Sequence, residues 1–525
     1  MAAHQSAKNV KWVEGLRGIA SVMVIMTHVA RAFDFALFFP RDRPDVPPRF
    51  WQLPIIRVPA QGRIGVPIFA FLTGFVCALK PLKLGRNRHQ QGEALMAVAK
   101  SAFRRPPRLV LPAAIATLIS FCLTAIGGYE TAHFCDSFWV RFDAPGMEPT
   151  FRRELTRLFR SLLTTWTSTD NAYDRHQWAM RPLLVGAFQV YILLAATMGM
   201  RLKYRMVVHV LLMAYWWLNR QANTETFGSL VSLGTLLADL SLHRPTQNFI
   251  ASNHRILSLV IAPLLILSGL FLGSYPQEHE DWSRWSLGLQ QTFVNMDPPT
   301  PGASRGSFLV PEGTDARRRF SSVAIQFCAV AVFISPVLRE FLSNRYFLWL
   351  GRHSFAVYLV HGTILRTVGM WIAYGLTPRF EQHEDGSYEE FLHIRSDTSK
   401  NVAILVFVVL TYSAAWAWMR WVDTACARAT QWLESKVFQA EDDEEAEETE
   451  KGFGGGLIDK HGKDYQRMAS IADSGVEATP EGPYPSAVPF QNHRRSGRCE
   501  EKEKRLLPST LARSEAYRAS PLRML

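Results

Sequence analysis

The sequence predicts an all-α protein that crosses a membrane several times and ends in a polar tail. Hydrophobic residues make up 48% of the 525 residues, while charged residues reach only 20%, below the roughly 25% of soluble domains. The mean hydropathy of -0.01 averages two unlike parts. Residues 1–436 carry a net charge of +16 and residues 437–525 a net charge of -4, so a polar tail dilutes an apolar body.

Apolar runs that approach the length of a transmembrane helix, about 17–25 residues, recur along the body. We expect about ten such helices in one membrane domain over residues 10–422. The runs lie at 16–38, 64–80, 106–126, 182–200, 204–219, 226–241, 256–273, 321–338, 347–373 and 401–422.

The basic residues predict the orientation of these helices. Residues 80–108, between the second and third runs, hold eight Lys and Arg side chains against one acid, Glu93, and such loops face the cytosol. Later basic clusters fall on the same side, whereas longer loops fall on the other. We therefore expect both termini in the cytosol. The sequence does not distinguish the endoplasmic reticulum from the plasma membrane.

The tail and the cysteines exclude other classes of protein. Residues 437–525 begin with an acidic run and contain few aliphatic residues, which predicts a disordered cytosolic extension. The six cysteines form no Cys-x-x-Cys pair and have no histidine at a zinc-site spacing, so we expect neither a disulfide framework nor a metal site. The basic residues lie between apolar runs, which is typical of membrane loops and not of a nucleic-acid surface.

Arg17 and His28 lie eleven residues apart in the first apolar run. Eleven helical steps of 100° bring the two side chains within about 20° of one stripe, with a separation of roughly 16 Å along the axis. A histidine inside a membrane helix either takes part in chemistry or forms a structural hydrogen bond between helices. The spacing alone leaves both readings open.

Arg105 and Arg108 flank two prolines at the expected start of the third helix. The pair either anchors the helix at the cytosolic surface or binds a ligand that carries phosphates, because guanidinium groups offer fork-shaped donors to phosphate oxygens. Proline loses no hydrogen bond in a first helical turn, so the prolines favour a helix that begins here.

Other polar residues could support such a site. Glu14 precedes Arg17 by one helical turn and could orient it through an i, i+3 pair. Ser354 and His361 are seven residues apart and therefore share one helix face. The hydroxyls of Thr73 and Ser354 could instead bond to backbone carbonyls, a common use of hydroxyls in membrane helices.

Five segments in order resemble the acyltransferase 3 family of integral-membrane O-acyltransferases, most closely its fungal branch. The first, EGLRGIA followed by His28, is similar to the family's opening motif of an arginine, ten residues and a histidine. The others are GVPIFAFLTGF at 65–75, the arginine pair at 105–108, LGTLLADL at 233–240 and LGRHSFAVYLVH at 350–361. Together they span roughly residues 10–422, and the family's fold has ten helices.

The resemblance implies transfer of an acyl group, often acetyl, from acyl-CoA to a hydroxyl of a carbohydrate, lipid or small metabolite. Acyl-CoA, a hydroxyl-bearing acceptor and membrane lipid are then the partners, and no bound cofactor is expected. We expect Arg105 and Arg108, with Arg17, to bind the CoA phosphates from the cytosol. His28 is then the general base, and a covalent acyl-histidine relay is the alternative.

One position departs from the family pattern. Members often carry a Trp-x-x-x-x-Glu segment at the start of the fourth helix, and here the segment that begins at Trp178 has Leu183 at the glutamate position. Asp174 lies nearby but out of register. Leu183 therefore favours a catalytically silent relative as one alternative function. A polytopic transporter, with Arg and His in a substrate pathway, is the other.

Overall fold

The computed structural model describes residues 2–219, 225–294, 307–311, 314–378, 380 and 390–438 of the chain. These residues form helices joined by turns, and their only β pairing is one isolated bridge between Cys135 and Leu392. The predicted all-α fold is confirmed. The tail predicted at 437–525 lies outside the described residues, apart from its first two positions.

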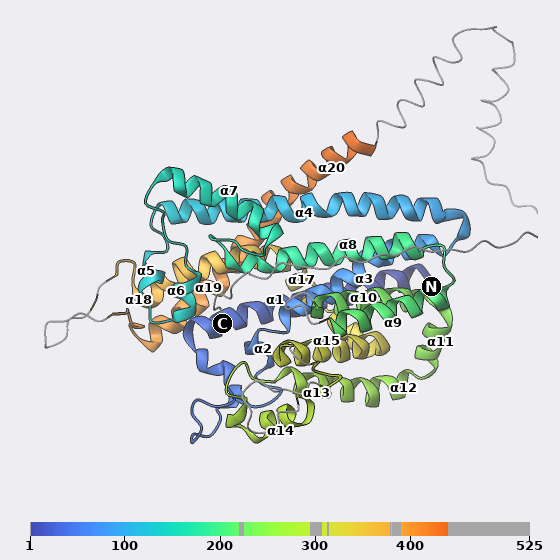
Figure 1. Cartoon of the computed structure of the whole chain (residues 1–525), viewed down its shortest axis with the longest axis horizontal. Coiled ribbons are helices and arrows are strands. Elements are labelled where there is room, and N and C mark those ends of the chain that lie inside the picture. Colours follow the sequence, from blue (N-terminus) through green and yellow to red (C-terminus); the bar gives the residue numbers. More distant parts are fainter. Residues whose placement is uncertain are drawn as a thin grey trace, which may run out of the picture. The chain divides into compact units, whose positions relative to one another are not determined.

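Twenty α-helices follow one another through the described residues (Figure 1). They are α1 (Ala2–Phe33), α2 (Val58–Gln61), α3 (Gly65–Gly85), α4 (Gln91–Ala125), α5 (Glu130–Phe134), α6 (Phe138–Asp143), α7 (Phe151–Thr167), α8 (Met180–Thr197), α9 (Leu202–Leu218), α10 (Glu225–Leu242), α11 (Arg244–Ser252), α12 (His254–Ile256), α13 (Ala262–Gly273), α14 (Arg284–Phe293), α15 (Ala316–Ile334), α16 (Pro336–Leu342), α17 (Arg345–Ile364), α18 (Met370–Tyr374), α19 (Asp397–Trp418) and α20 (Thr424–Phe438).

Shorter helical segments connect several of these helices. Three π-helical turns, η5 (Leu257–Ile261), η7 (Leu365–Gly369) and η8 (Met419–Asp423), continue α12 into α13, α17 into α18 and α19 into α20. The 3-10 turns are η1 (Phe35–Phe38), η2 (Phe50–Gln52), η3 (Arg88–Gln90), η4 (Arg175–Ala179) and η6 (Glu280–Trp282). Single π turns inside α-helices often mark functional sites, and η7 and η8 both lie beside the site described below.

A helix is present at each of the ten predicted ranges, although the ranges differ in their capacity to cross a membrane. Among the described residues, seven helical stretches are long and apolar enough to span, or up to eight if α15 and α16, which are bent by 102°, form one broken span. The remaining two are shorter: α9 has 17 residues and the apolar part of α10 is Thr226–Leu242. The chain is a multi-pass membrane protein, and the count of ten stays a prediction.

Two helices extend well beyond the apolar runs that predicted them. The third was expected to begin at residue 106, but α4 begins at Gln91, so Pro106 and Pro107 lie inside the helix. The prediction that these prolines occupy a first turn is therefore wrong. Residues 91–105 are polar enough to escape a search for apolar runs, yet they are rich in good helix formers. In the same way, the tenth helix continues past residue 422 to Phe438.

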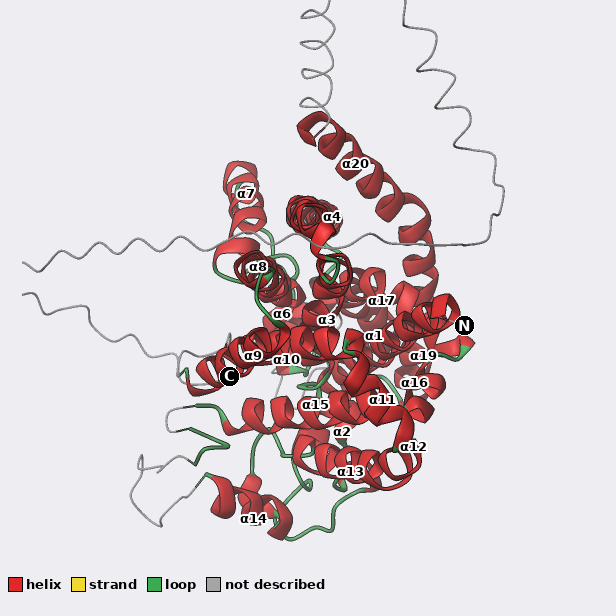
Figure 2. Cartoon of the chain, turned by 90° about the vertical axis from the view of Figure 1, so that its right-hand side faces the viewer, coloured by secondary structure: helices red, strands yellow, loops and turns green. Residues whose placement is uncertain are grey.

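Helices α1 and α17 pack against each other at the centre of the bundle. A Cβ atom at Gly18 would lie 2.6 Å from the carbonyl oxygen of Phe347, and one at Gly351 would lie 1.9 Å from that of Glu14. Only glycine fits at such close approaches, and small residues are the usual means by which membrane helices come together. Figure 2 shows α1, α3 and α17 inside the bundle, with α4, α7 and α20 to one side. The side chains of α1 and α17 are thereby brought within reach of each other.

Candidate active site

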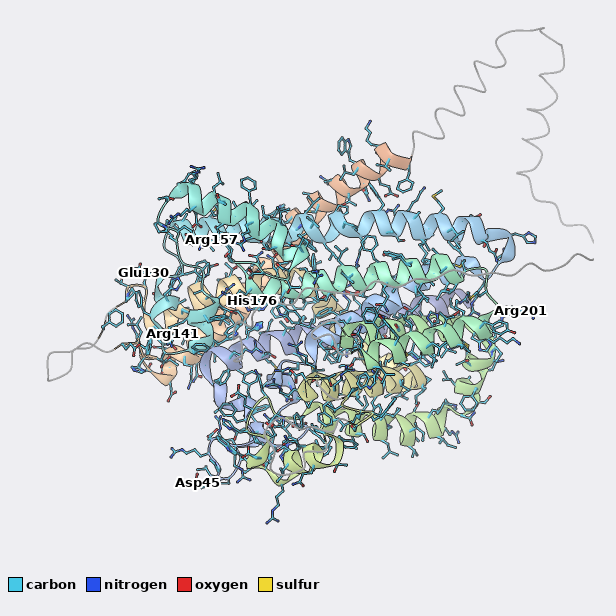
Figure 3. All side chains as sticks on the ribbon, viewed as in Figure 1. Asp45, Glu130, Arg141, Arg157, His176 and Arg201 are labelled. Carbon is cyan, nitrogen blue, oxygen red and sulfur yellow. The ribbon has the colours of Figure 1, made fainter. Side chains whose placement is uncertain are left out.

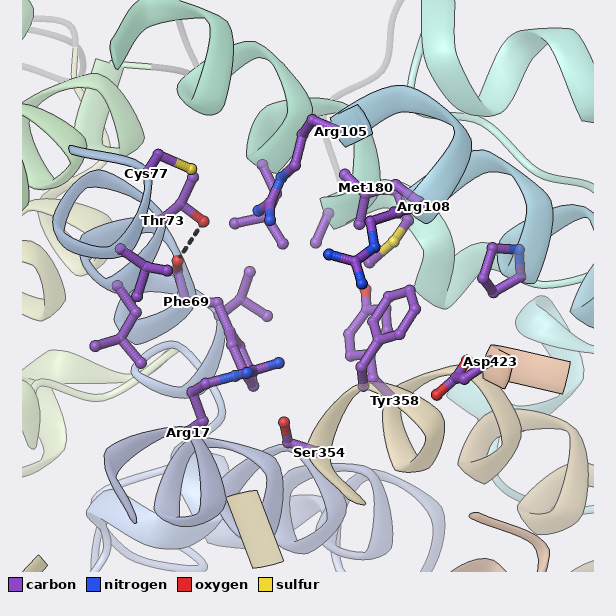
Figure 4. Close-up of a pocket in the computed structure, with 18 of the residues that line it drawn as sticks. Arg17, Phe69, Thr73, Cys77, Arg105, Arg108, Met180, Ser354, Tyr358 and Asp423 are labelled. Carbon is purple, nitrogen blue, oxygen red and sulfur yellow. Dashed lines mark hydrogen bonds between the residues drawn. The ribbon is translucent and has the colours of Figure 1, made fainter. Parts of the chain in front are cut away.

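A cavity of about 390 Å³ opens between α1, α3, α4, α8, α17 and η8. Four arginines and one acid, Asp423, are among its lining residues. The arginines are Arg17 from α1, Arg105 and Arg108 from α4, and Arg352 from α17. Figure 4 shows Arg17 on one side and Arg105 and Arg108 on the other, with their guanidinium groups turned toward the space between them. This excess of positive charge is suited to an anionic ligand.

Three polar atoms at the cavity are buried without a hydrogen-bond partner in the described part of the chain. They are the Nε of Arg105, the Oγ of Ser354 and the Oδ1 of Asp423. Buried polar atoms are normally bonded, so unpaired atoms beside one cavity indicate a place where a ligand supplies the missing partners. Arg17, by contrast, is held by Glu14 at 3.3 Å, which is the expected i, i+3 pair.

Thr73 and Leu183 are two further predicted residues at the cavity. The hydroxyl of Thr73 donates to the backbone carbonyl oxygen of Phe69 at 2.8 Å, which is the structural role expected of a hydroxyl in a membrane helix. Leu183 also lines the cavity. A glutamate at position 183 would therefore stand among the arginines, whereas leucine adds no negative charge to the cavity.

His28 and His361 do not line the cavity but form a separate cluster with His176, in which His176 and His361 are buried and His28 is partly exposed. The Nδ1 of His28 lies 3.1 Å from the Nε2 of His361, and the ring centres of His28 and His176 are 4.3 Å apart. The ring of Trp139 packs beside His28 at 5.2 Å. Figure 3 places His176 inside the bundle, whereas Arg201 lies at one end of it.

The backbone determines the tautomer of His361. Its Nδ1 is 2.8 Å from the carbonyl oxygen of Tyr358 and 3.0 Å from that of Val357. Carbonyl oxygens only accept, so Nδ1 carries the proton and, in the neutral ring, Nε2 carries the lone pair. The Nδ1–H of His28 then donates to that lone pair. The Nε2 of neutral His28 is left with a lone pair, as a general base requires.

The sequence does not point to His176, whose imidazole has a carboxylate partner. Its Nδ1 lies 2.9 Å from the Oδ1 of Asp174, and Arg366 donates to the same oxygen at 3.0 Å. Asp174 and Arg366 are buried, with relative exposures of 1% and 0%. The sequence points to Asp174 as an acid near the expected glutamate position, but not to His176. The Asp-x-His spacing just before Trp178 is the signal in the sequence that could have found it.

Tyr358 connects the cavity to the histidine cluster. Its side chain lines the cavity, its hydroxyl donates to the backbone carbonyl of His176, and its ring centre is 5.9 Å from that of His361. Helix α1 also connects the two groups, because Arg17 lies at the cavity and His28 lies in the cluster. The predicted site residues fall into two neighbouring groups with Tyr358 between them.

Further charged groups surround the cluster. Arg31 lies one turn after His28 on α1, 5.6 Å from the ring centres of both Phe38 and Trp139. Asp143, at the end of α6, has its carbonyl oxygen bonded by Arg366. Burial raises the pKa of the Asp143 carboxyl, and Arg366 acts in the opposite direction. The cluster is thus enclosed by two guanidinium groups and two carboxyl groups.

The three imidazoles could in principle bind a metal ion, because one ligating nitrogen from each lies within 4.8 Å of the others. Around a tetrahedral zinc ion with Zn–N distances of about 2.0–2.1 Å, these nitrogens would be roughly 3.4 Å apart. The Nδ1 of His28 and the Nε2 of His361, at 3.1 Å, are close to that spacing, whereas the neighbouring guanidinium groups of Arg31 and Arg366 disfavour a further cation.

The chain is similar in sequence to known acyltransferases. A family model described as an acyltransferase domain, Acyl_transf_3, matches residues 10–420, and the chain therefore belongs to the acyltransferase 3 family. The O-acetyltransferase PaAT-1 of Phomopsis amygdali is 23% identical over 463 residues, which cover 82% of this chain and 86% of that protein. No solved structure matches. The protein is a multi-pass membrane O-acyltransferase, and the family and enzyme class predicted from the motifs are confirmed.

Proposed function

We propose that the protein transfers an acetyl group from acetyl-CoA to a hydroxyl group of a carbohydrate, lipid or small metabolite. The observation that carries this proposal is the arginine-lined cavity next to the His28–His361 pair, with Arg17 and His28 on the same helix. Similarity to an O-acetyltransferase supports acetyl as the acyl group. Acetyl-CoA is the donor substrate, and the reaction calls for no further cofactor.

The cavity receives the phosphates of CoA. Arg105 and Arg108 face Arg17 across it, and the unpaired Nε of Arg105 offers a donor for a phosphate oxygen. The loop charges favour a cytosolic position for this end of the helices and for both termini, and acyl-CoA is made in the cytosol. The pantetheine arm then extends along α1 past Tyr358 toward His28, over roughly 16 Å.

His28 acts as the general base. Its Nε2 takes the proton of the acceptor hydroxyl while the oxygen forms a bond to the acyl carbon of the thioester. The carbon–sulfur bond breaks, and the thiolate of CoA leaves and takes up the proton. His361 supports this step because its Nε2 holds the Nδ1–H of His28 at 3.1 Å. In the alternative relay, the Nε2 of His28 attacks the thioester and carries the acyl group itself.

A binding titration of acetyl-CoA to the purified full chain tests the donor site. The double variant Arg105→Ala, Arg108→Ala is expected to bind at least tenfold more weakly, because two charge-assisted contacts to phosphate are lost. Arg104→Ala is the matched control, since Arg104 lies on the same helix but pairs with Glu434 and is not among the cavity residues. Equal affinities of the double variant and the wild type would make this pair a membrane anchor only.

Mass spectrometry of the products tests the reaction and identifies the acceptor. The wild type is incubated with acetyl-CoA and a panel of sugar, sterol, diacylglycerol and terpene alcohols in detergent. A mass increase of one acetyl group on a panel member, together with release of CoA, supports the enzyme. Binding of acetyl-CoA without product from any member would instead support a catalytically silent relative.

A further inference from the structure

One ring nitrogen of His176 is hydrogen-bonded, and the other has no partner among the described residues. Its Nδ1 is held by Asp174, while its Nε2 is buried and has no hydrogen-bond partner among the residues that the structure describes. His176 is only 4% exposed. An unpaired acceptor in such a place costs free energy, and neither the donor cavity nor the His28–His361 pair makes use of it.

The dyad of Asp174 and His176 has the geometry of a base that is oriented by a carboxylate. Oδ1 of Asp174 accepts the Nδ1–H, which leaves the lone pair of the neutral ring on Nε2. Arg366 and Gln177 hold the carboxylate in turn, at 3.0 and 3.4 Å. Carboxylate–imidazole pairs of this kind stabilise the positive charge that develops on a histidine during acyl transfer.

The His176 ring of the dyad lies directly against His28. The ring centre of His176 is 4.3 Å from that of His28 and 4.9 Å from that of His361. The other charged groups that act on His28 are Arg31, on the same helix, and Arg366, from η7. Asp143, from α6, interacts with both of these arginines. Without Asp174 and His176, the positive charge of a protonated His28 would lie near these two guanidinium groups, with little negative charge to offset it.

We infer that the dyad of Asp174 and His176 stabilises the proton that His28 takes from the acceptor, so that His176 is a positioning residue for the base. In the resting enzyme the Nε2 lone pair of His176 is unpaired. When His28 becomes an imidazolium ion, the adjacent lone pair and the carboxylate behind it lower the energy of that state. The benefit appears only as the proton moves, and such differential stabilisation is what accelerates a reaction. This inference rests on the proposed role of His28.

Chemical labelling of His28 tests the inference without the acceptor. Diethyl pyrocarbonate reacts with neutral imidazole, so labelling of the His28 peptide in the full-length protein rises with pH as the ring loses its proton. The labelling is followed by mass spectrometry from about pH 4 to pH 8, around the ordinary range of histidine. In Asp174→Asn and in His176→Asn the protonated ring loses its stabilisation. The midpoint is then expected to move to lower pH by about one unit, a tenfold change in the proton affinity.

Asp143→Asn is the matched control. Asp143 is also buried and also contacts Arg366, through its backbone carbonyl, but the carboxylate that bonds to His176 is that of Asp174. In Asp143→Asn, the midpoint of His28 labelling against pH should stay close to that of the wild type. Retention of acetyl-CoA binding by each variant shows that the protein is folded, because the donor cavity is separate from the cluster.

Kinetics then separate this inference from the proposed function. If His28 is the base, both dyad variants lower kcat at least tenfold while KM for acetyl-CoA stays the same. Unchanged midpoints in both variants would overturn the inference and leave the role of His28 intact. One zinc ion per chain, lost in His176→Asn, would also overturn it and make the cluster a metal site. Full activity of His28→Ala would instead remove the proposed function.

Discussion

Leu183 is a cavity residue that departs from the family pattern, with an uncharged side chain where members often carry a glutamate. It lines the same space as Arg17, Arg105 and Arg108, where a carboxylate would pair with one or more guanidinium groups. Leucine keeps these groups available for a ligand. The departure therefore bears on donor binding, and it does not touch the histidine cluster.

Leu183→Glu tests this reading of the residue. The new carboxylate should compete with the CoA phosphates for the arginines and raise Kd for acetyl-CoA about tenfold, or 1.4 kcal/mol. Leu183→Gln has nearly the same shape without the charge and should change Kd much less. A faster reaction with an unchanged Kd in Leu183→Glu would show that position 183 serves the acceptor instead.

Gly362 sets the position of His176. A Cβ atom at residue 362 would lie 2.4 Å from the Nδ1 of His176, closer than non-bonded atoms approach. Gly362→Ala should therefore displace His176 from Asp174 and lower kcat at least tenfold, with KM for acetyl-CoA unchanged. Gly288→Ala, where nothing lies within 4 Å, is the control in steady-state assays. Wild-type kcat in Gly362→Ala would contradict the placement of His176.

At the scale of elements, α1 joins the two halves of the site. Helical periodicity predicts that Arg17 and His28 share a stripe, and the chain forms one helix from Ala2 to Phe33. The partners of His28 were harder to predict. His361 lies on α17 with a clear apolar pattern, whereas His176 lies in η4, a five-residue turn that follows the short loop after α7 and has no periodic signal. Only the tertiary fold brings this turn back against α1.

Helix α4 shows that apolar runs do not predict where a helix begins. Apolar runs mark the part of a helix that meets lipid or the core, so they located the helix but not its start at Gln91. Arg105 and Arg108 therefore project from the middle of a helix that continues on both sides. Their approach to Arg17 depends on how α4 packs across the bundle, which the local sequence does not encode.

The close approach of α1 and α17 gives a prediction about stability. Gly351→Ala places a Cβ atom 1.9 Å from the carbonyl oxygen of Glu14 and forces the two helices apart. Such overpacking costs about 1–3 kcal/mol, so the melting temperature of the purified protein should fall by several degrees. Gly92→Ala on α4, which meets nothing within 4 Å, should melt like the wild type. A wild-type melting curve for Gly351→Ala would contradict the packing of α1 on α17.

At the scale of the whole molecule, the helix bundle holds the arginine-lined cavity and the histidine cluster as two separate but neighbouring sites. The arginine-lined cavity suits a charged, water-soluble donor, while the histidine cluster suits proton transfer away from water. Tyr358 contacts both. A membrane enzyme arranged in this way can bind a cytosolic acyl-CoA on one side and use an acceptor that arrives from the lipid or from the opposite face.

The most direct test of the account is acetyl transfer by His28→Ala, measured beside its affinity for acetyl-CoA. The account predicts that the variant binds acetyl-CoA as the wild type does, because His28 is not a cavity residue, and that it loses at least 99% of the transfer rate, since a general base contributes about 10²–10⁴-fold. A variant that binds acetyl-CoA and still forms the acetylated product at the wild-type rate would contradict the account.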